Sequence, residues 1–157
     1  MEYLIKTAEA ADEPRINELF VEMLCSIYET DTAEGYTDGQ LNRYFSSGED
    51  RIFIAEAEGV LAAFLSLEVH REEEAFIYYD DFSVSAPWRG KGLGTALIAA
   101  AEAYCRSLGI KRTVLHVEEA NLRALRLYKR LGFTVLRREG TRLRMVKSLD
   151  DTGRIST

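Results

Sequence analysis

A turn with three alternating glycines, set between an apolar strand and a long alanine-rich helix, is the feature that most constrains this chain. The turn lies in residues 82–95, which read Phe-Ser-Val-Ser-Ala-Pro-Trp-Arg-Gly-Lys-Gly-Leu-Gly-Thr. Glycines let the backbone approach a ligand closely, and the free N–H groups at a helix N-terminus favour an anion there. Arg89 and Lys91 add positive charge to the same turn. The pattern therefore predicts a site for a phosphate or pyrophosphate group.

The spacing of this turn differs from that of two common nucleotide-binding motifs. It reads Arg89-x-x-Gly92-x-Gly94, without the Gly-Lys-Ser/Thr that ends a P-loop and without the Gly-x-Gly-x-x-Gly of a dinucleotide site. An unrelated nucleotide-binding domain is therefore disfavoured. The turn alone does not decide the matter, because a glycine-rich connection can also be only a tight loop.

Residues 113–133 supply a second motif, in which a β-branched strand leads to a loop with Asn121 and then to a short helix ending at Gly132. Together with the glycine turn, this order of segments resembles the GNAT superfamily of N-acetyltransferases, which bind acetyl-coenzyme A. In that family an asparagine lies beside the cofactor, and the helix closes in a Leu-Tyr-Lys-x-x-Gly-Phe signature, here residues 127–133. The resemblance covers residues 50–147 well and the N-terminal third in outline.

The length and the charge agree with one enzyme domain. A single domain over residues 1–149 is expected from 157 residues, and the tail at 150–157 is predicted to be disordered. The formal charge of −6, from 26 acidic and 20 basic residues, argues against general binding to nucleic acid. Basic residues gather in the two motifs, where a polyanionic donor would bind, and acidic residues gather between and within strands.

Cysteine usage and the N-terminus predict the compartment and the absence of metal. Cys25 and Cys105 each fall in an apolar helical pattern, so two buried thiols are expected rather than a disulfide or a metal pair. With no Cys-x-x-Cys and no histidine cluster, no metal is predicted. The N-terminus lacks a signal-type apolar core, and the apolar runs are far shorter than the ~20 residues that span a bilayer. A cytoplasmic protein without a membrane partner is expected.

Hydrophobic periodicity predicts the elements in outline. The expected helices are one capped by Asp12, a short one at 37–45, one from Leu93 to Leu108, and the helix that ends at Gly132. The expected strands are 3–7, 52–58, 60–69, 75–84, 113–118 and two after residue 133, with a hairpin turn at Glu58-Gly59.

A helix joins strands 75–84 and 113–118, so these strands should be parallel neighbours with a right-handed crossover. The fold class is α/β. The resemblance implies a GNAT-like mixed, mostly antiparallel sheet with a central parallel, splayed strand pair and helices on both faces.

The resemblance also implies a donor site in the cleft between the splayed strands. Backbone groups of Phe82 and Val84 would pair with the pantetheine arm, the loop amides from Gly90 to Thr95 would hold the pyrophosphate, and Asn121 would bond the arm or its neighbourhood. The full set of residues expected to bind acetyl-coenzyme A is Phe82, Val84, Arg89, Gly90, Lys91, Gly92, Leu93, Gly94, Thr95, Asn121 and Tyr128.

Acyl transfer to an amine needs a proton acceptor for the ammonium, a polarised thioester carbonyl and a proton donor for the leaving thiolate. Tyr128 occupies the family position of the general acid, and the competing interpretation is a core tyrosine on an amphipathic helix. A backbone N–H near Phe82 is the expected carbonyl polariser.

The general base is assigned from the strand before the glycine turn. Asp80 alternates with Phe82 and Val84, so in a regular strand these three share a face and Asp81 points the other way. The segment resembles the paired-acid strand of polyamine-type GNAT enzymes, in which the first acid relays the amine proton. Aspartate replaces the usual longer glutamate, so a bridging water is expected. Glu118 is the competing base, and His70 and His116 are more simply packed or surface residues.

Together, these features predict an N-acetyltransferase that moves the acetyl group of acetyl-coenzyme A to a primary amine by direct attack in a ternary complex. The expected acceptor is a small, cationic molecule or a peptide. The alternative is a GNAT-fold module that binds acyl-coenzyme A without turnover, as a sensor or interaction partner. The sequence does not decide between a monomer and a homodimer. Tyr128 and the strand acids favour the enzyme.

Overall fold

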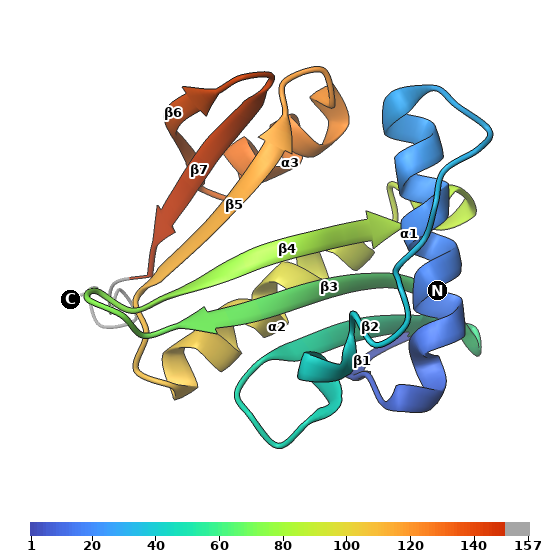
Figure 1. Cartoon of the computed structure of the whole chain (residues 1–157), viewed down its shortest axis with the longest axis horizontal. Helices are drawn as coiled ribbons and strands as arrows, with labels where there is room; N and C mark the ends of the chain where they lie inside the picture. Colours follow the sequence, from blue (N-terminus) through green and yellow to red (C-terminus); the bar gives the residue numbers. More distant parts are fainter. Residues whose placement is uncertain (150–157) are drawn as a thin grey trace.

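The computed structural model describes residues 1–149, so the predicted disorder of 150–157 lies outside the described residues. A seven-stranded sheet forms the middle layer, with α1 on one face and α2 and α3 on the other (Figure 1). The helices are α1 (Glu13–Tyr28), α2 (Leu93–Ser107) and α3 (Leu122–Arg130), with short 3-10 turns η1 (Ala10–Asp12), η2 (Asn42–Phe45) and η3 (Ala86–Trp88). The strands are β1 (Tyr3–Thr7), β2 (Arg51–Ala57), β3 (Val60–His70), β4 (Phe76–Val84), β5 (Arg112–Glu118), β6 (Thr134–Glu139) and β7 (Arg142–Ser148).

Local sequence explains most element boundaries. Glu58 and Gly59 both have positive φ, 52° and 82°, which is the conformation that a two-residue hairpin between twisted strands requires. Asp12 is the N-cap of α1 as expected, but its carboxylate accepts from the N–H of Glu9, 2.8 Å away, instead of capping the helix itself. The short helix expected at 37–45 is reduced to η2.

The sheet order is β1-β2-β3-β4-β5-β7-β6, and every neighbouring pair is antiparallel except β4 and β5. This parallel pair has only three registered positions, from Ile77 opposite Thr113 to Tyr79 opposite Leu115. Beyond them the two strands diverge, as Figure 1 shows, each still running toward its own carboxyl end. The predicted mixed sheet with a central splayed pair is confirmed.

Alternation along the strands divides the core into two layers. Between α1 and the sheet lie Ile16, Leu19, Ile54 and Phe64, all fully buried. The larger layer lies between the sheet and α2 and α3, and its fully buried members include Leu97. The helices on both sides of the sheet are therefore held by burial of apolar surface, which stabilises the fold by roughly 25 cal/mol per Å² buried.

A β-bulge in β4 overturns one expectation about the face on which its side chains lie. Leu65 pairs with Phe82 but Leu67 pairs with Tyr79, so two residues of β4 oppose one residue of β3. The extra residue shifts the side chains that follow it to the opposite face of the sheet from the one that regular alternation predicts. Phe82 consequently packs on the α2 side together with Tyr79, and Asp80 does not share its face, contrary to the regular-strand prediction.

Both cysteines are free thiols. Cys105 is buried in the layer between the sheet and α2, and Cys25 is half-buried on α1. Within residues 1–149 no helix has the length and apolar character that a membrane crossing requires.

Candidate active site

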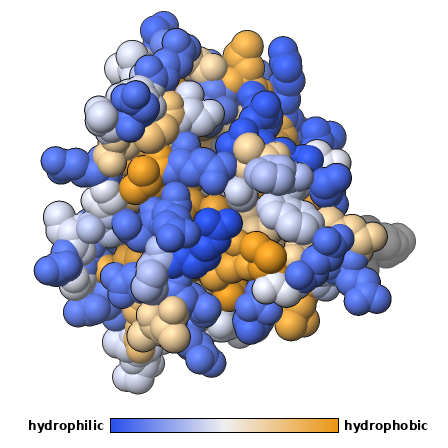
Figure 2. Space-filling model, turned by 90° about the vertical axis from the view of Figure 1, so that its right-hand side faces the viewer, coloured by the Kyte–Doolittle hydropathy of each residue, from blue (hydrophilic) through white to orange (hydrophobic). Residues whose placement is uncertain are grey.

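The glycine turn and the N-terminus of α2 form one wall of a cavity of about 430 Å³ at the carboxyl end of β4. The view of Figure 2 faces this end of the molecule, where apolar surface is exposed among polar side chains. Nine of the eleven residues predicted to bind the donor line this cavity: Phe82, Val84, Arg89, Gly90, Gly92, Leu93, Gly94, Thr95 and Asn121. Lys91 and Tyr128 are not among the residues that line it.

Two glycines of the turn are required for different reasons. Gly92 is the N-cap of α2 with φ of 88°, a left-handed conformation that glycine adopts without steric cost. Gly94 lies inside the first turn of α2, where an added Cβ would stand 3.0 Å from Cζ of Phe82 and 3.4 Å from Cδ2 of Leu127. Since no side chain among residues 1–149 caps α2, its first N–H groups are available to an anion.

Arg89 is held on the inner side of the turn by two partners. Its Nε donates to the carbonyl of Val84 at 2.9 Å, and its Nη2 lies 3.9 Å from the carboxylate of Glu22 on α1. Glu22 also accepts from the hydroxyl of Ser85 at 3.1 Å and from the N–H of Ala86 at 2.8 Å. The Val84 carbonyl, predicted to pair with the pantetheine arm, is therefore already occupied by Arg89.

Sequence reasoning missed the wall that α1 contributes to the cavity. Met23, Ser26 and Ile27 line it from α1, and Arg123 and Arg130 line it from α3. The helical spacing of the two arginines is also that of an ordinary solvent-exposed helix face, so it did not by itself indicate the cavity. Nothing in the local sequence of α1 signals that its second half faces a turn some sixty residues further along the chain.

Tyr128 packs in the layer on the α2 side of the sheet. Tyr128 is 6% exposed. The centroid of its ring lies 6.0 Å from that of Phe82 and 5.7 Å from that of Phe133. Burial raises the pKa of its phenol, and the neighbouring phenol of Tyr78 adds to the effect. The hydroxyl forms no hydrogen bond within residues 1–149. A phenol in this state remains protonated at neutral pH and has its proton free to donate.

Asp80 and Asp81 form an acidic pair at the bulge on the α1 side. Asp81 accepts a hydrogen bond of 2.7 Å from the phenol of Tyr36, whose ring stacks on Phe20. Burial raises the pKa of Asp81, and the bond from Tyr36 opposes this. Burial raises the pKa of Asp80 to about 7, helped by the charges of Asp81 and Glu68 and by a hydrogen bond with Glu68. Asp80 stays open to solvent on one side, although its carboxyl has lost much of its hydration.

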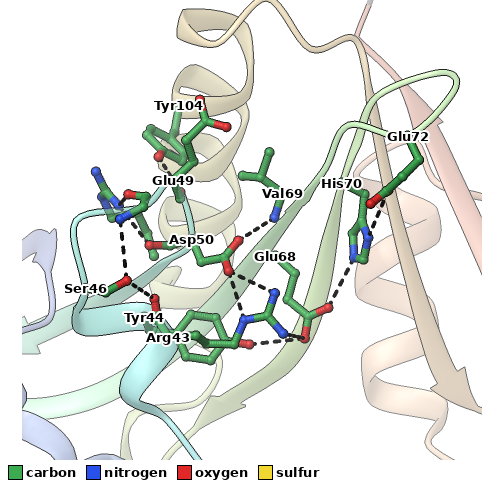
Figure 3. Close-up of polar contacts among 12 residues, drawn as sticks. Arg43, Tyr44, Ser46, Glu49, Asp50, Glu68, Val69, His70, Glu72 and Tyr104 are labelled. Carbon is green, nitrogen blue, oxygen red and sulfur yellow. Dashed lines mark hydrogen bonds and ion pairs between the residues drawn. The ribbon is translucent and has the colours of Figure 1, made fainter.

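Glu68 belongs to a polar network that ties η2 to β3 (Figure 3). Its carboxylate accepts from the phenol of Tyr44 at 3.3 Å and lies 3.8 Å from Nη1 of Arg43 and 3.3 Å from Nε2 of His70. Arg43 is itself paired with Asp50 at 2.9 Å. This network fixes a negative charge beside Asp80, which favours protonation of Asp80 in the free protein.

The other two predicted functional residues make structural contacts. Glu118 accepts from the phenol of Tyr28 at 3.2 Å and from the hydroxyl of Thr141 at 2.9 Å, so its carboxylate already has two partners. Asn121 is the N-cap of α3, and its side-chain oxygen accepts from the N–H of Ala124 at 3.4 Å.

The model of the acetyltransferase (GNAT) family matches residues 16–133, and the chain therefore belongs to that family. Among its relatives, mycothiol acetyltransferase of Thermobispora bispora is 41% identical over 88 residues, which are 52% of this chain and 29% of that protein. The uncharacterized N-acetyltransferase YycN of Bacillus subtilis is 44% identical over 64 residues, which are 41% of this chain and 40% of that protein. The chain thus spans less than half of the length of these relatives.

Solved structures agree in fold. The PaiA N-acetyltransferase of Thermoplasma acidophilum, in complex with coenzyme A, superposes with a TM-score of 0.78 at 18% sequence identity. The superposition covers 94% of this chain and 99% of that one.

Proposed function

We propose that this chain is an N-acetyltransferase that moves the acetyl group of acetyl-coenzyme A to a primary amine, by direct attack in a ternary complex. The observation that carries the proposal is the cavity at the N-terminus of α2, which lies between the carboxyl end of β4, α1 and α3. A diphosphate suits the helix end and its positive potential, and an extended arm suits the gap between two strands. Coenzyme A bound to the related Thermoplasma acidophilum fold supports the identity of the donor.

Arg89 would change partners when the donor binds. Its guanidinium now satisfies the Val84 carbonyl and lies near Glu22, and a diphosphate would offer it a stronger, charge-assisted interaction. Release of the Val84 carbonyl would then leave it free to accept an amide N–H of the pantetheine arm.

The acidic groups support a cationic acceptor. Asp80, Asp81 and Glu68 gather on the α1 side of β4. Arg43 is a neighbouring cation, and its charge lowers the pKa of Asp80 in opposition to the two carboxylates. A bound ammonium would favour the charged form of Asp80, so cation binding and Asp80 ionisation reinforce each other. We propose that Asp80 holds the acceptor ammonium or assists its deprotonation.

Tyr128 is the proposed general acid. Its phenol has no competing hydrogen-bond acceptor within residues 1–149 and lies between Phe82 and Phe133, in the layer that meets the strand gap. As the amine attacks the thioester carbonyl and the carbon–sulfur bond breaks, this phenol would give its proton to the departing thiolate.

The test is thiol release from acetyl-coenzyme A across matched amines. The panel contains 1,4-diaminobutane and ethylamine as cations, glycinamide as a weaker base, glutamate as an anion, and an Ala-Ala peptide. We expect the cationic amines to have the highest kcat/KM and Asp80→Asn to reduce that preference. Calorimetric binding of acetyl-coenzyme A without thiol release for any amine would favour the non-catalytic module, and failure to bind the donor would refute the assignment altogether.

A further inference from the structure

Three side chains from three strands form a continuous hydrogen-bonded chain that the site described above does not use. The hydroxyl of Tyr78 on β4 lies 2.7 Å from Nδ1 of His116 on β5, and Nε2 of His116 lies 2.8 Å from Oε1 of Glu139 on β6. A carboxylate can only accept, so Nε2 carries the hydrogen, and Nδ1 of the neutral ring is the acceptor for the Tyr78 O–H. The carboxylate thereby fixes both the tautomer and the orientation of the imidazole.

The hydrogen bonds from Tyr78 through His116 to Glu139 run across the sheet at the point where the parallel pairing of β4 and β5 ends. Tyr78 pairs with Val114 one position before the last registered pair, and His116 is the first residue of β5 beyond that pair. Tyr78 lies on the same strand as Asp80, whose charge adds to burial in raising the pKa of Tyr78 to about 12. The Tyr78 phenol is also the group that perturbs Tyr128. Tyr78 therefore lies two residues before Asp80 on β4, where the pairing of β4 with β5 ends.

The outer end of the hydrogen-bonded chain reaches solvent. The His116 side chain is only 11% exposed, whereas that of Glu139 is 31% exposed and reaches the surface beside Arg137. The phenol is half-buried at the inner end.

Charges of both signs surround the chain. Arg144 lies opposite His116 on β7, Arg142 and Arg144 both act on Tyr78, and Arg137 pairs with Glu139 at 2.6 Å. The neighbouring carboxylates are those of Glu139 on β6, Glu118 on β5, and Asp80 and Glu68 on β4 and β3. Guanidinium groups and carboxylates therefore both lie around the hydrogen-bonded side chains.

We propose that Tyr78, His116 and Glu139 form the relay that takes up the proton of the acceptor ammonium, an inference that rests on the proposed acetyl transfer. The Tyr78 oxygen receives a proton from the amine nitrogen while its own hydroxyl proton passes to Nδ1 of His116. The amine becomes neutral and nucleophilic, Tyr78 is unchanged, and the imidazolium is held by the Glu139 carboxylate until the proton passes to solvent. Tyr78 is the catalytic residue of the relay, His116 and Glu139 act through it, and Asp80 serves to hold the cation.

The experiment compares Tyr78→Phe, His116→Gln and Glu139→Gln with the parent, with Tyr3→Phe, at an exposed tyrosine on β1, as the matched tyrosine control. We expect kcat for ethylamine to fall roughly 10²-fold in the first two variants and roughly 10-fold in Glu139→Gln, with little change in KM. The double variant of Tyr78 and His116 should be no slower than either single variant, because either change cuts the same chain. Tyr3→Phe should keep the parental rate and pH profile.

A second substrate distinguishes proton removal from general damage to the site. 2,2,2-Trifluoroethylamine is already neutral near neutral pH, so it bypasses the proposed step, and the loss in His116→Gln should be far smaller with it than with ethylamine. In the free parent, the ¹⁵N spectrum of His116 should report a hydrogen on Nε2 and a bare, hydrogen-bonded Nδ1.

The possible failures are separable. A parent that transfers acetyl to the amines while His116→Gln stays within about twofold of it across pH would overturn the relay and leave the proposed function intact. Equal losses with both amines, or additive losses in the double variant, would also overturn it. A parent that acetylates no amine would refute the proposed function and the relay together. Should a variant fail to fold, the histidine spectrum of the parent still decides, since a hydrogen on Nδ1 contradicts the relay.

Discussion

Replacement of Asp80 by asparagine is predicted to stabilise the free protein at neutral and alkaline pH. The carboxyl of Asp80 is partly buried beside the charges of Asp81 and Glu68, and its pKa is raised from 3.8 to about 7. Ionisation of Asp80 therefore costs more in the folded protein than in the unfolded chain. Asparagine keeps the shape of the side chain and removes that cost.

The sign and the size follow from linkage. Below about pH 4 Asp80 is protonated in both states and contributes no difference, whereas between about pH 4 and about pH 7 the unfolded chain loses the proton first. The folded state thus loses stability as pH rises through this window, and the loss is complete above about pH 7. Full desolvation would correspond to about 4 kcal/mol, and solvent contact reduces this to about 1–2 kcal/mol. For a domain of this length the melting temperature should rise by about 2 to 8 °C.

The assay is thermal or urea unfolding of the parent and Asp80→Asn at about pH 4 and about pH 8. Asp38→Asn, an exposed acid in the loop before η2, is the matched control. We expect Asp80→Asn to gain stability at the higher pH only and Asp38→Asn to change little at either. A variant that is less stable than the parent at about pH 8, or a gain that is the same at both pH values, would refute the reasoning.

Three further predictions concern the donor side of the site. Gly94→Val, whose Cβ would press on Phe82, should weaken acetyl-coenzyme A binding at least about tenfold by calorimetry, whereas Gly48→Val, at an open loop position, should not. Tyr128→Phe should lower kcat with little change in donor affinity or melting temperature, since the hydroxyl bonds no partner within residues 1–149, and parental turnover would reduce Tyr128 to a packing residue. Glu22→Ala should lower the free energy of urea unfolding by about 1–3 kcal/mol and weaken donor binding, because the N–H of Ala86 loses its acceptor. If both quantities are unchanged, Glu22 does not anchor the turn.

The sequence by itself determined the features that depend on near neighbours in the chain. The Glu58-Gly59 hairpin, the glycine turn before α2 and the crossover that makes β4 and β5 parallel all follow from local backbone preferences and chain handedness. The two motifs likewise predicted the family, together with nine of the residues that line the cavity, because a turn and the helix it starts are built from contiguous residues.

Only the tertiary structure decided which side chains face one another across the sheet. The bulge in β4 depends on its pairing with β3, and it places Asp80 on the face away from Phe82, whereas period-two alternation put both on one face. The contact of Arg89 with Glu22 and the chain from Tyr78 through His116 to Glu139 join elements far apart in sequence. No local preference encodes such contacts, since their formation depends on strand register and on the packing of α1 against the sheet.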